Sequence, residues 1–391
     1  MIPLMKSAFY KEHETRLKLS EFILKADQLS MSEQCYQFEE KFAEFCKSKY
    51  AILFNSGGSA NLALLQALKN QGLLRSGSKI AFSALTWSTN VMPIIQLGME
   101  PVPVDVDPNS LNIMSENVKE LIENNEIDAL FTTNVLGFAG DLDKIKELCT
   151  NNNVIFLEDN CEALGTELQG RKTGTFGLAG THSFFVAHHM STIEGGMICT
   201  DDEDLADMLK IVRANGWDRN LSAKKQISLR KRYDVNSEFQ AKYTFYDLGY
   251  NFRPTEITGF LGLVQLEYLK ENIIMREKNH NFLELSVLNN EDLVQIEHNH
   301  LNVVSGFAFP VIAKTSALRD KYFAQFSGAG VEIRPIISGN MEKQPFFKKY
   351  VTKAYSLPVA DKIHDCGFYF GNYPELNTSD LNILSNCLTK Y

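Results

Sequence analysis

The sequence predicts an α/β fold built on a mainly parallel sheet. Between about residues 50 and 200, short apolar runs alternate with stretches of helical periodicity, which is the order of strand–helix units. The apolar runs are nearly continuous, as in strands that are buried on both faces. A glycine-containing turn at residues 55–59 joins the first run directly to a helical stretch. These three observations indicate helices on both faces of one sheet.

Seven strands are expected, at Tyr50–Phe54, Lys79–Phe82, Pro101–Val106, Ile127–Thr132, Val154–Leu157, His182–Val186 and Met197–Thr200. Helices are expected between them, at Ala60–Leu68, Val91–Leu97, Val118–Ile122 and Ile145–Cys149. Before the sheet, Ser30 and Glu33 have the spacing of a capping box and precede a periodic apolar stripe. After it, residues 217–248 are polar and charged and predict a long loop. A long helix is expected from Thr255 to about Met275.

The chain has 391 residues, which is enough for two or three domains and a large core. We predict an N-terminal helical segment at residues 1–30 and a large α/β domain at residues 31–285. Residues 286–391 mix short strands and helices, which predicts a smaller C-terminal α+β domain.

Composition narrows the function classes. Hydrophobic residues make up 44% of the chain and charged residues 22%, which is typical of a globular protein. The net charge of −9 disfavours a nucleic-acid partner, because binding to a phosphate backbone rests on dense positive charge. No apolar run approaches the roughly 20 residues of a membrane span, and the N-terminus lacks the apolar core of a secretory signal. A cytoplasmic enzyme is expected.

The seven cysteines are odd in number and widely spaced, which argues against a disulfide framework. None of them forms a CxxC pair, and none lies between Cys199 and Cys366. The spacing therefore predicts neither a zinc ribbon nor an iron–sulfur cluster, and no metal site is expected.

The segment Asn55–Ala60 (NSGGSA) stands where the first strand meets a helix. Glycine lets the backbone approach a ligand closely, and a helix N-terminus offers free N–H groups to an anion. The segment can be a phosphate cradle or a simple tight turn, and its residues alone favour neither interpretation.

Two acidic residues follow the fifth expected strand. Asp159 lies at the carboxyl end of that strand, where open α/β sheets bind ligands, and its carboxylate could pair with a protonated ring nitrogen. Glu162 is three residues further on and within reach of the same place. Taken alone, Asp159 is better explained as the N-cap of a following helix.

The stretch Gly174–Gly196 contains a hydroxyl and an imidazole five residues apart, Ser183 and His188. A glycine pair follows them after Glu194, and the arrangement suggests a loop that crosses a ligand. For His189, a structural role is the better interpretation.

Five stretches of the chain resemble the sugar-nucleotide aminotransferases of the aspartate-aminotransferase fold type, which use pyridoxal phosphate. They are NSGGSANLALLQAL, FSALTWSTNVMPI, FLEDNCEALGT, GTFGLAGTHSFFVAHHMSTIEGG and LGYNFRPTEITGFLGLVQLE. They occur in the family's order over most of residues 30–275, and the C-terminal part matches more loosely. The resemblance implies the fold type I architecture of pyridoxal-phosphate-dependent transferases.

The resemblance ends at the position where those aminotransferases have a lysine that bonds covalently to the cofactor. This sequence has His188 there, and no lysine occurs from Thr173 through Leu209. Imidazole has no primary amine to condense with an aldehyde, but its ordinary pKa of about 6.5 suits proton transfer. We therefore expect pyridoxamine phosphate bound without a covalent bond, with His188 as the catalytic residue that moves a proton.

Histidine at this position is typical of the sugar-nucleotide 3-dehydratases, which remove the C3 hydroxyl of a 4-keto-6-deoxyhexose. One branch acts on CDP-linked sugars and uses an iron–sulfur cluster, whose cysteines should follow the histidine, where this chain has only Cys199. The other acts on GDP-4-keto-6-deoxymannose in colitose biosynthesis, needs no cluster and uses glutamate to regenerate pyridoxamine phosphate. The sequence resembles the second branch.

The resemblance also implies roles for the residues that would bind the cofactor. Gly57, Gly58 and Ser183 would hold the phosphate, and Trp87 would stack on the pyridine ring. Asp159 would pair with the ring nitrogen. Glu162 would lie beside the ring hydroxyl, where a glutamine is commoner in the family.

A second group of residues concerns the partner subunit and the substrate. By resemblance, Asn251 would reach the phosphate of the neighbouring subunit, which implies a homodimer with shared active sites. Arg219, Arg253 and Glu332 are candidates for contacting the nucleotide sugar. Asn215 stands where a histidine is common in the family, and its role stays open.

Two alternatives differ in what they predict. An aminotransferase that works without the lysine would give an amino-sugar product. A non-catalytic binding protein that had lost its lysine would have no physical reason to keep Asp159, Ser183, Trp87 and the glycine pair.

Overall fold

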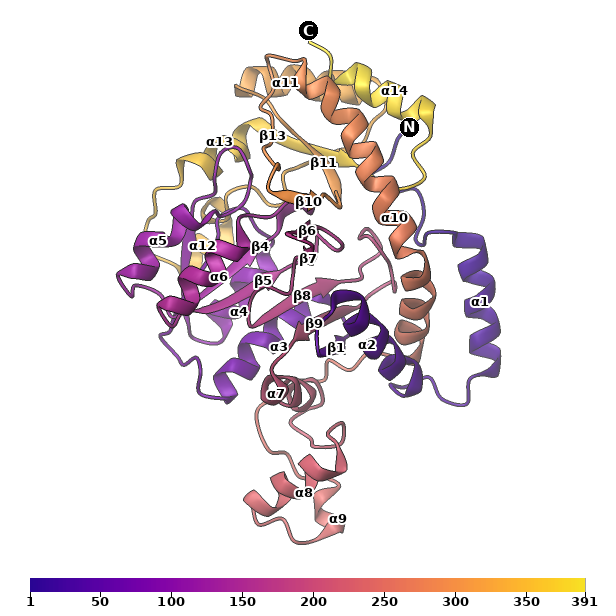
Figure 1. Cartoon of the computed structure of the whole chain (residues 1–391), viewed down its shortest axis with the longest axis vertical. Coiled ribbons are helices and arrows are strands. Elements are labelled where there is room, and N and C mark those ends of the chain that lie inside the picture. Colours follow the sequence, from indigo (N-terminus) through magenta and orange to yellow (C-terminus); the bar gives the residue numbers. More distant parts are fainter. Residues whose placement is uncertain (391) are drawn as a thin grey trace.

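The computed structural model describes residues 1–390, and within them seven strands form one large sheet in the order β1-β9-β8-β5-β4-β2-β3 (Figure 1). The strands are β1 (Tyr50–Phe54), β2 (Lys79–Ser83), β3 (Glu100–Val104), β4 (Ala129–Thr133), β5 (Ile155–Asp159), β8 (Ala179–Ser183) and β9 (Gly196–Thr200). β9 is antiparallel to both of its neighbours, and the other pairs of adjacent strands are parallel. The predicted α/β fold with a mainly parallel seven-stranded sheet is confirmed.

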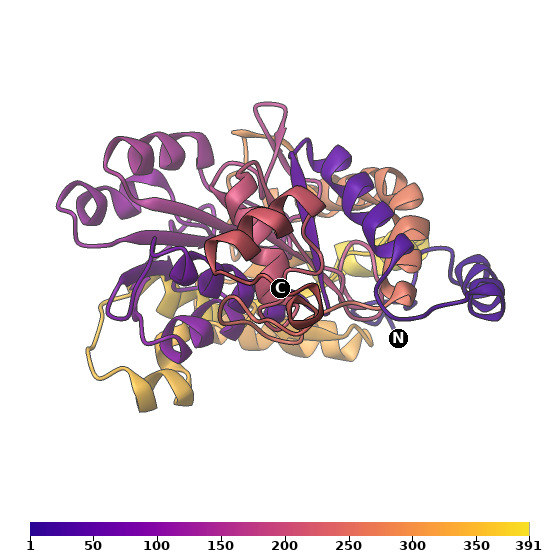
Figure 2. The ribbon, with the colours of Figure 1, turned by 90° about the horizontal axis from the view of Figure 1, so that it is seen from below.

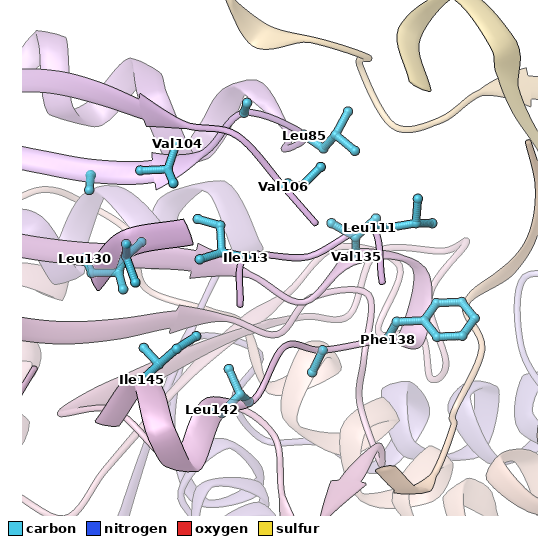
Figure 3. Close-up of a cluster of buried hydrophobic side chains, with 14 of the residues drawn as sticks. Leu85, Val104, Val106, Leu111, Ile113, Leu130, Val135, Phe138, Leu142 and Ile145 are labelled. Atoms are coloured by element: carbon cyan, nitrogen blue, oxygen red, sulfur yellow. The ribbon is translucent and has the colours of Figure 1, made fainter. Parts of the chain in front are cut away.

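Helices cover both faces of this sheet because neighbouring strand residues point to opposite sides. On one face, Phe131 of β4 belongs to a core shared with α3 (Gly57–Asn70), α4 (Ser88–Gln96) and α7 (Glu203–Arg213). On the other face, Leu130 of β4 packs in a core shared with α5 (Ser115–Glu123) and α6 (Leu142–Asn151), part of which Figure 3 shows. The sheet is therefore buried on both sides, which explains its continuous apolar runs.

The strand expected at residues 182–186 is displaced toward the N-terminus. β8 pairs with β9 from Ala179 opposite Thr200 to Ser183 opposite Gly196, and the chain leaves the sheet after Ser183. Phe184 packs in the core beside β1 and β9, whereas Phe185 is 42% exposed. The apolar run at residues 182–186 therefore extends beyond the strand, and its last residues lie in the loop that follows β8.

Helix α2 (Glu33–Cys46) forms where predicted, but its N-terminus is capped by a distant residue. The expected capping box between Ser30 and Glu33 is wrong, since the helix has Ser32 at its N-cap and no side-chain hydrogen bond from that residue. The N–H groups of Ser32, Gln34 and Cys35 donate to the buried carboxylate of Glu256, at 2.6, 2.9 and 3.2 Å. A carboxylate satisfies several orphan donors and complements the helix dipole, so it takes the place of the local hydroxyl.

Residues 217–248 project from the body of the molecule as a separate lobe (Figure 1). The prediction of a long loop is wrong in part, because the lobe contains α8 (Ala223–Arg232) and α9 (Glu238–Ala241). Helix α8 buries none of its residues, so it has no apolar stripe that a sequence could reveal. Hydroxyl N-caps at Ser222 and Ser237 start the two helices instead.

The predicted long helix is confirmed and extends further than expected, as α10 (Glu256–Leu288). Helix α1 (Glu12–Lys25) lies on the outer side of α10 (Figure 2). Phe22 of α1 stacks on Phe260 of α10 with ring centroids 4.4 Å apart. The predicted boundary at residue 285 falls inside the last turn of α10, and the division into domains stays a prediction. None of the helices among the described residues has the length and apolarity that crossing a membrane requires.

The C-terminal part contains a second sheet, of β11 (Ala308–Ile312), β13 (Gly367–Gly371) and β12 (Ile333–Pro335), all antiparallel. Its helices are α11 (Ser316–Gly328), α12 (Pro345–Tyr350), α13 (Pro358–Cys366) and α14 (Thr378–Cys387). A third small sheet joins β6 (Glu167–Leu168), β7 (Arg171–Lys172) and β10 (Leu301–Val303). The two-residue strands of this third sheet are too short for the sequence to indicate.

Candidate active site

A cavity of about 400 Å³ lies at the carboxyl ends of the parallel strands, where such sheets bind ligands. A volume of this size suits a small-molecule site. Seven of the residues predicted from the sequence line it: Gly57, Gly58, Trp87, Asp159, Glu162, Ser183 and His188. The fold therefore brings together residues that are far apart in the sequence. We call this space the cavity.

The glycine turn forms one wall of the cavity. Ser56 is the N-cap of α3, and its hydroxyl accepts a bond of 3.0 Å from the Ser59 N–H. Gly57 and Gly58 occupy the first turn of α3, where N–H groups have no partner within the helix. A Cβ on Gly57 would lie 2.8 Å from the Cβ of Ser183, so only glycine lets these segments meet. The turn thus presents N–H groups and the Ser183 hydroxyl together, which suits a phosphate.

The two adjacent acidic residues at the end of β5 have different surroundings. Glu158 is buried, and its carboxylate accepts bonds from the N–H groups of Gly174, Phe176 and Gly177 at 2.5–2.9 Å. It therefore anchors the Gly174–Gly177 turn, whose residues do not line the cavity.

Asp159 points to the other side of the strand and lines the cavity. Its carboxylate accepts a bond of 2.8 Å from the Asn61 side chain and one of 2.9 Å from the Cys161 N–H. In the described chain the next element after it is β6 and not a helix, so its interpretation as an N-cap is wrong. The carboxylate is held rigidly and the residue is 4% exposed, as a partner for a cationic ring nitrogen should be.

Glu162 lines the cavity next to Asp159, and the Leu136 N–H donates to it at 2.9 Å. Burial raises the pKa of Glu162 to about 7, the Leu136 bond opposes the shift, and the charge of Asp159 adds to it. The carboxyl can therefore gain or lose a proton near neutral pH. The phenol of Tyr369 on β13 also lines the cavity, and burial together with Glu162 raises its pKa to about 12.

His188 lies in the turn that follows β8, and its backbone N–H donates to the Phe185 carbonyl at 2.9 Å. Its ring packs against that of Phe307 with centroids 5.1 Å apart, and Nδ1 has no protein partner among the described residues. Desolvation, and then the nearby charge of Arg276, lower the pKa of His188 to about 4. At neutral pH the imidazole is uncharged and able to accept a proton.

A buried hydrogen-bond network holds the two segments that flank the His188 ring. Asn272 on α10 donates to the His189 carbonyl at 2.6 Å and accepts a bond of 2.6 Å from the Arg276 guanidinium. Arg276 also donates to the carbonyls of Phe307, at 2.9 Å, and Asn372. His189 is buried and bonds the Ser305 carbonyl through Nε2 at 2.8 Å, which agrees with the structural role expected for it.

Three predicted residues lie elsewhere, in a second hollow of about 400 Å³ that we call the arginine hollow. It contains Arg219, Asn251 and Arg253, with Trp217 as its aromatic wall. The guanidinium of Arg219 lies 4.0 Å from the Trp217 ring centre, and Arg253 donates to the Asn251 side chain at 3.1 Å. None of these three side chains lines the cavity of its own chain.

Glu332 lies outside both spaces. Its carboxylate accepts bonds from the Leu4 N–H at 3.1 Å and from the Arg334 side chain at 2.5 Å. These contacts do not test its predicted contact with the substrate, which stays a prediction. Asn215, whose role the sequence leaves open, adopts a left-handed conformation with φ 60° before Gly216.

The structure adds cavity residues that sequence reasoning misses: Ser56, Thr89, Asn90, Thr133, Cys161, Phe185, Ala187, Glu194, Phe307, Ile337 and Tyr369. Glu194 stands beside the glycine pair of the predicted ligand loop, so its position is within reach of sequence reasoning. Phe307, Ile337 and Tyr369 come from the C-terminal part, and no local pattern indicates that this part folds over the sheet edge.

The family follows from a comparison with family models. The model described as the DegT/DnrJ/EryC1/StrS aminotransferase family matches residues 11–389. The chain belongs to this family. Among the relatives of this DegT/DnrJ/EryC1/StrS chain is the GDP-4-keto-6-deoxy-D-mannose 3-dehydratase of Escherichia coli O55:H7. The two are 34% identical over 360 residues, which cover 91% of this chain and 92% of the relative.

Solved structures similar to this family member include GDP-4-keto-6-deoxymannose-3-dehydratase with a trapped PLP-glutamate geminal diamine. It has a TM-score of 0.91 and 32% identity, with all of both chains covered. A variant of the same enzyme with bound GDP-perosamine has a TM-score of 0.90 and 31% identity, again over the full length of both chains. These likenesses confirm the predicted fold type and the predicted family.

Proposed function

We propose that the chain is a pyridoxamine-phosphate-dependent 3-dehydratase of GDP-4-keto-6-deoxymannose. It removes the C3 hydroxyl to give the 4-keto-3,6-dideoxy sugar and releases ammonia, and glutamate regenerates the cofactor. The similar dehydratases support the substrate, and the one with a trapped PLP-glutamate geminal diamine supports both the cofactor and glutamate. We place the reaction in the cytoplasm, in the biosynthesis of a colitose-type sugar of a lipopolysaccharide O-antigen.

The observation that carries this proposal is the position of His188 in the cavity wall. Of the residues that the structure describes, no lysine lines the cavity, so a covalent bond to the cofactor has no amine to form it. His188 instead offers a neutral imidazole with an unpartnered nitrogen. A group that can move a proton but cannot form an imine with the cofactor favours elimination over amine transfer.

The rest of the cavity fits pyridoxamine phosphate. Asn90 is fully buried in the lining and neither atom of its amide has a protein partner among the described residues, as expected of a group that serves a ligand. The start of α3 with Ser183 would hold the phosphate, and Asp159 would hold a protonated ring nitrogen. Trp87 is 54% exposed at the cavity, a large aromatic surface that a stacked ring would cover.

When bound, pyridoxamine phosphate supplies an amine that joins the sugar's C4 carbonyl and a conjugated ring that accepts electrons. His188 accepts a proton at its imidazole nitrogen and can return it, since its neutral form dominates at neutral pH. Asn272 and Arg276 keep the ring of His188 in place through the His189 and Phe307 carbonyls. Phe185, Phe307 and Tyr369 line the cavity with aromatic surface and limit the access of water.

We further propose a homodimer in which the arginine hollow of one chain completes the cavity of its partner. Arg219, Asn251 and Arg253 carry two positive charges and an amide that are exposed in a single chain. A cofactor phosphate and a nucleoside diphosphate are anions of the kind that arginine binds best. The similarity to an enzyme with bound GDP-perosamine supports a GDP-linked ligand for the chain.

The decisive assay incubates the protein with pyridoxamine phosphate, glutamate and GDP-4-keto-6-deoxymannose. We expect the 3,6-dideoxy sugar by mass spectrometry, with ammonia and 2-oxoglutarate released. An amino sugar in its place would establish an aminotransferase that works without the lysine. Failure to bind pyridoxamine phosphate in an absorbance titration would instead establish a non-catalytic protein.

A further inference from the structure

Two histidines and a glutamate lie close together at the C-terminal part of α10, and none of them has been assigned a role in the reaction. His280 and Glu284 are one turn apart on α10, and His298 comes from the segment that follows it. One ring nitrogen of each histidine and one carboxylate oxygen all lie within 4.8 Å of one another. His298 Nε2 is 2.7 Å from Glu284 Oε1. None of the three lines the cavity or the arginine hollow.

His280 is the member whose surroundings call for a ligand. Its exposed fraction is 3%, and neither of its ring nitrogens has a hydrogen-bond partner among the described residues. Its ring is surrounded by Phe138, Phe309 and His298, with centroids 5.1–5.6 Å away. Buried polar groups are normally paired, so an imidazole left open on both sides needs an explanation.

We propose that His280, Glu284 and His298 form a binding site for a divalent transition-metal ion, with Zn²⁺ as the best match. Two imidazole nitrogens and one carboxylate oxygen are a common set of zinc ligands, and they leave a fourth position for water. Mg²⁺ and Ca²⁺ prefer more oxygen ligands than this set provides. The side chains of Glu284 and His298 are 20% and 21% exposed, which gives the ion a route from solvent.

An ion at this place would join α10 to residues 289–300, the segment that leads from the helix to the small third sheet. The bound ion would fix that segment at the point where the rings of Phe138 and of Phe309 on β11 meet His280. Its role would therefore be structural, and its effect is expected on unfolding rather than on turnover.

A second set of possible ligands, Cys46, His182 and Cys199, is a weaker candidate. All three are buried, so the set offers no route from solvent. Thiols bind zinc after losing their protons. The pKa of Cys199 is raised well above its usual range, mainly by a hydrogen bond with Cys46 and also by burial, so this thiol does not readily lose its proton. This set serves as a control.

The test dialyses the full chain against ZnCl₂, measures metal content by mass spectrometry and obtains the affinity by competition with a chelating dye. We expect one Zn²⁺ per chain in the wild type, and an affinity more than about tenfold weaker in His298→Ala and in Glu284→Gln. His300→Ala is the matched control, because His300 is two residues away and bonds the Ala139 carbonyl through Nε2 at 2.9 Å. Zn²⁺ should raise the Tm of the wild type and of His300→Ala, but not that of His298→Ala.

Three results would overturn the proposal. The first is a wild-type chain that takes up no stoichiometric zinc. The second is an equal zinc affinity in His298→Ala, Glu284→Gln and the wild type. The third is zinc binding that is lost in Cys199→Ser and kept in His298→Ala, which would assign the ion to the buried cysteines.

Discussion

The cavity and the arginine hollow have the same volume of about 400 Å³ but are built in different ways. In the cavity, Asp159 and the turn around His188 are fixed by buried hydrogen bonds from within the chain. In the arginine hollow, Arg219 and Arg253 are exposed. Arg219 stacks on an aromatic ring and donates to the Lys242 carbonyl at 3.0 Å, and Arg253 donates to a neighbouring amide. The cavity holds groups that can react, whereas the hollow holds positive charge without a base. The difference agrees with our proposal that the hollow serves a ligand whose reacting atoms lie in another chain's cavity.

Replacing His188 tests the cavity half of this comparison and has the largest expected effect. His188→Asn keeps a polar side chain of similar size but removes the base, so dehydration should fall by roughly 10²- to 10⁴-fold. Turnover is measured as ammonia release. Pyridoxamine phosphate should still bind with an affinity close to that of the wild type, because the phosphate and ring-nitrogen contacts remain. If the variant had the same turnover as the wild type, His188 would have no role in the reaction.

Mixing two impaired variants tests whether the two spaces belong to one site. Asn251→Ala should weaken cofactor binding by about tenfold through the loss of a hydrogen bond to a charged group, which leaves it nearly inactive at limiting cofactor. When equal amounts of His188→Asn and Asn251→Ala chains are unfolded and refolded together, half of the dimers are mixed. Each mixed dimer has one site with both native residues, so activity should recover to about a quarter of the wild-type value.

The same mixture discriminates against a cavity that is complete in one chain. In that case the mixed sample would show no more than the average of the two variants' activities. Analytical ultracentrifugation of each variant supplies the control, because a variant that no longer dimerises could not take part in the exchange.

The contrast also explains which parts the sequence could predict. The strands, α3 and the residues at the strand ends follow local rules, since a buried strand needs apolar residues and a glycine turn is readable in the chain. Asp159 is predictable for this reason, whereas Ser183 falls inside the expected strand 182–186 and receives its role only from the resemblance. His188 is identified because it stands at the position of the family's lysine, and not by its spacing from Ser183.

Other features depend on contacts between distant segments and leave no local signal. Glu256 caps α2 from more than 200 residues away. From the middle of α10, Asn272 reaches the His188 turn and Arg276 reaches the Phe307 carbonyl. In the sequence these residues look like ordinary polar positions of a helix. Helix α8 escapes prediction for a different reason, because a helix with no buried face has no periodicity to detect.

Removing the Asn272 side chain tests whether the cavity depends on this long-range network. Asn272→Ala leaves the His189 carbonyl and one donor of Arg276 unpaired inside the protein, so the free energy of unfolding should fall by about 1–3 kcal/mol. Turnover should fall while the affinity for pyridoxamine phosphate stays nearly constant. Asn281→Ala, at an exposed position of the same helix, is the matched control for urea unfolding. Equal free energies of unfolding for the two variants would contradict the structural role of Asn272.

Glu162→Gln tests the electrostatics of the cavity through the pH dependence of stability. Because burial raises the folded-state pKa of Glu162 to about 7, above its ordinary value of 4.5, the folded chain binds more protons than the unfolded chain between these two pH values. The contribution of Glu162 to stability is therefore complete below pH 4.5 and is lost as the pH rises to about 7.

Glutamine at position 162 keeps the shape of the side chain and can still accept the Leu136 bond without titrating. Without cofactor, the wild type should lose more unfolding free energy than this variant as urea titrations move from about pH 5 to about pH 7.5. Parallel pH curves would show that Glu162 stays ionised in the folded chain. In that case the cavity would face solvent more than its contacts indicate, and its contrast with the exposed arginine hollow would be smaller.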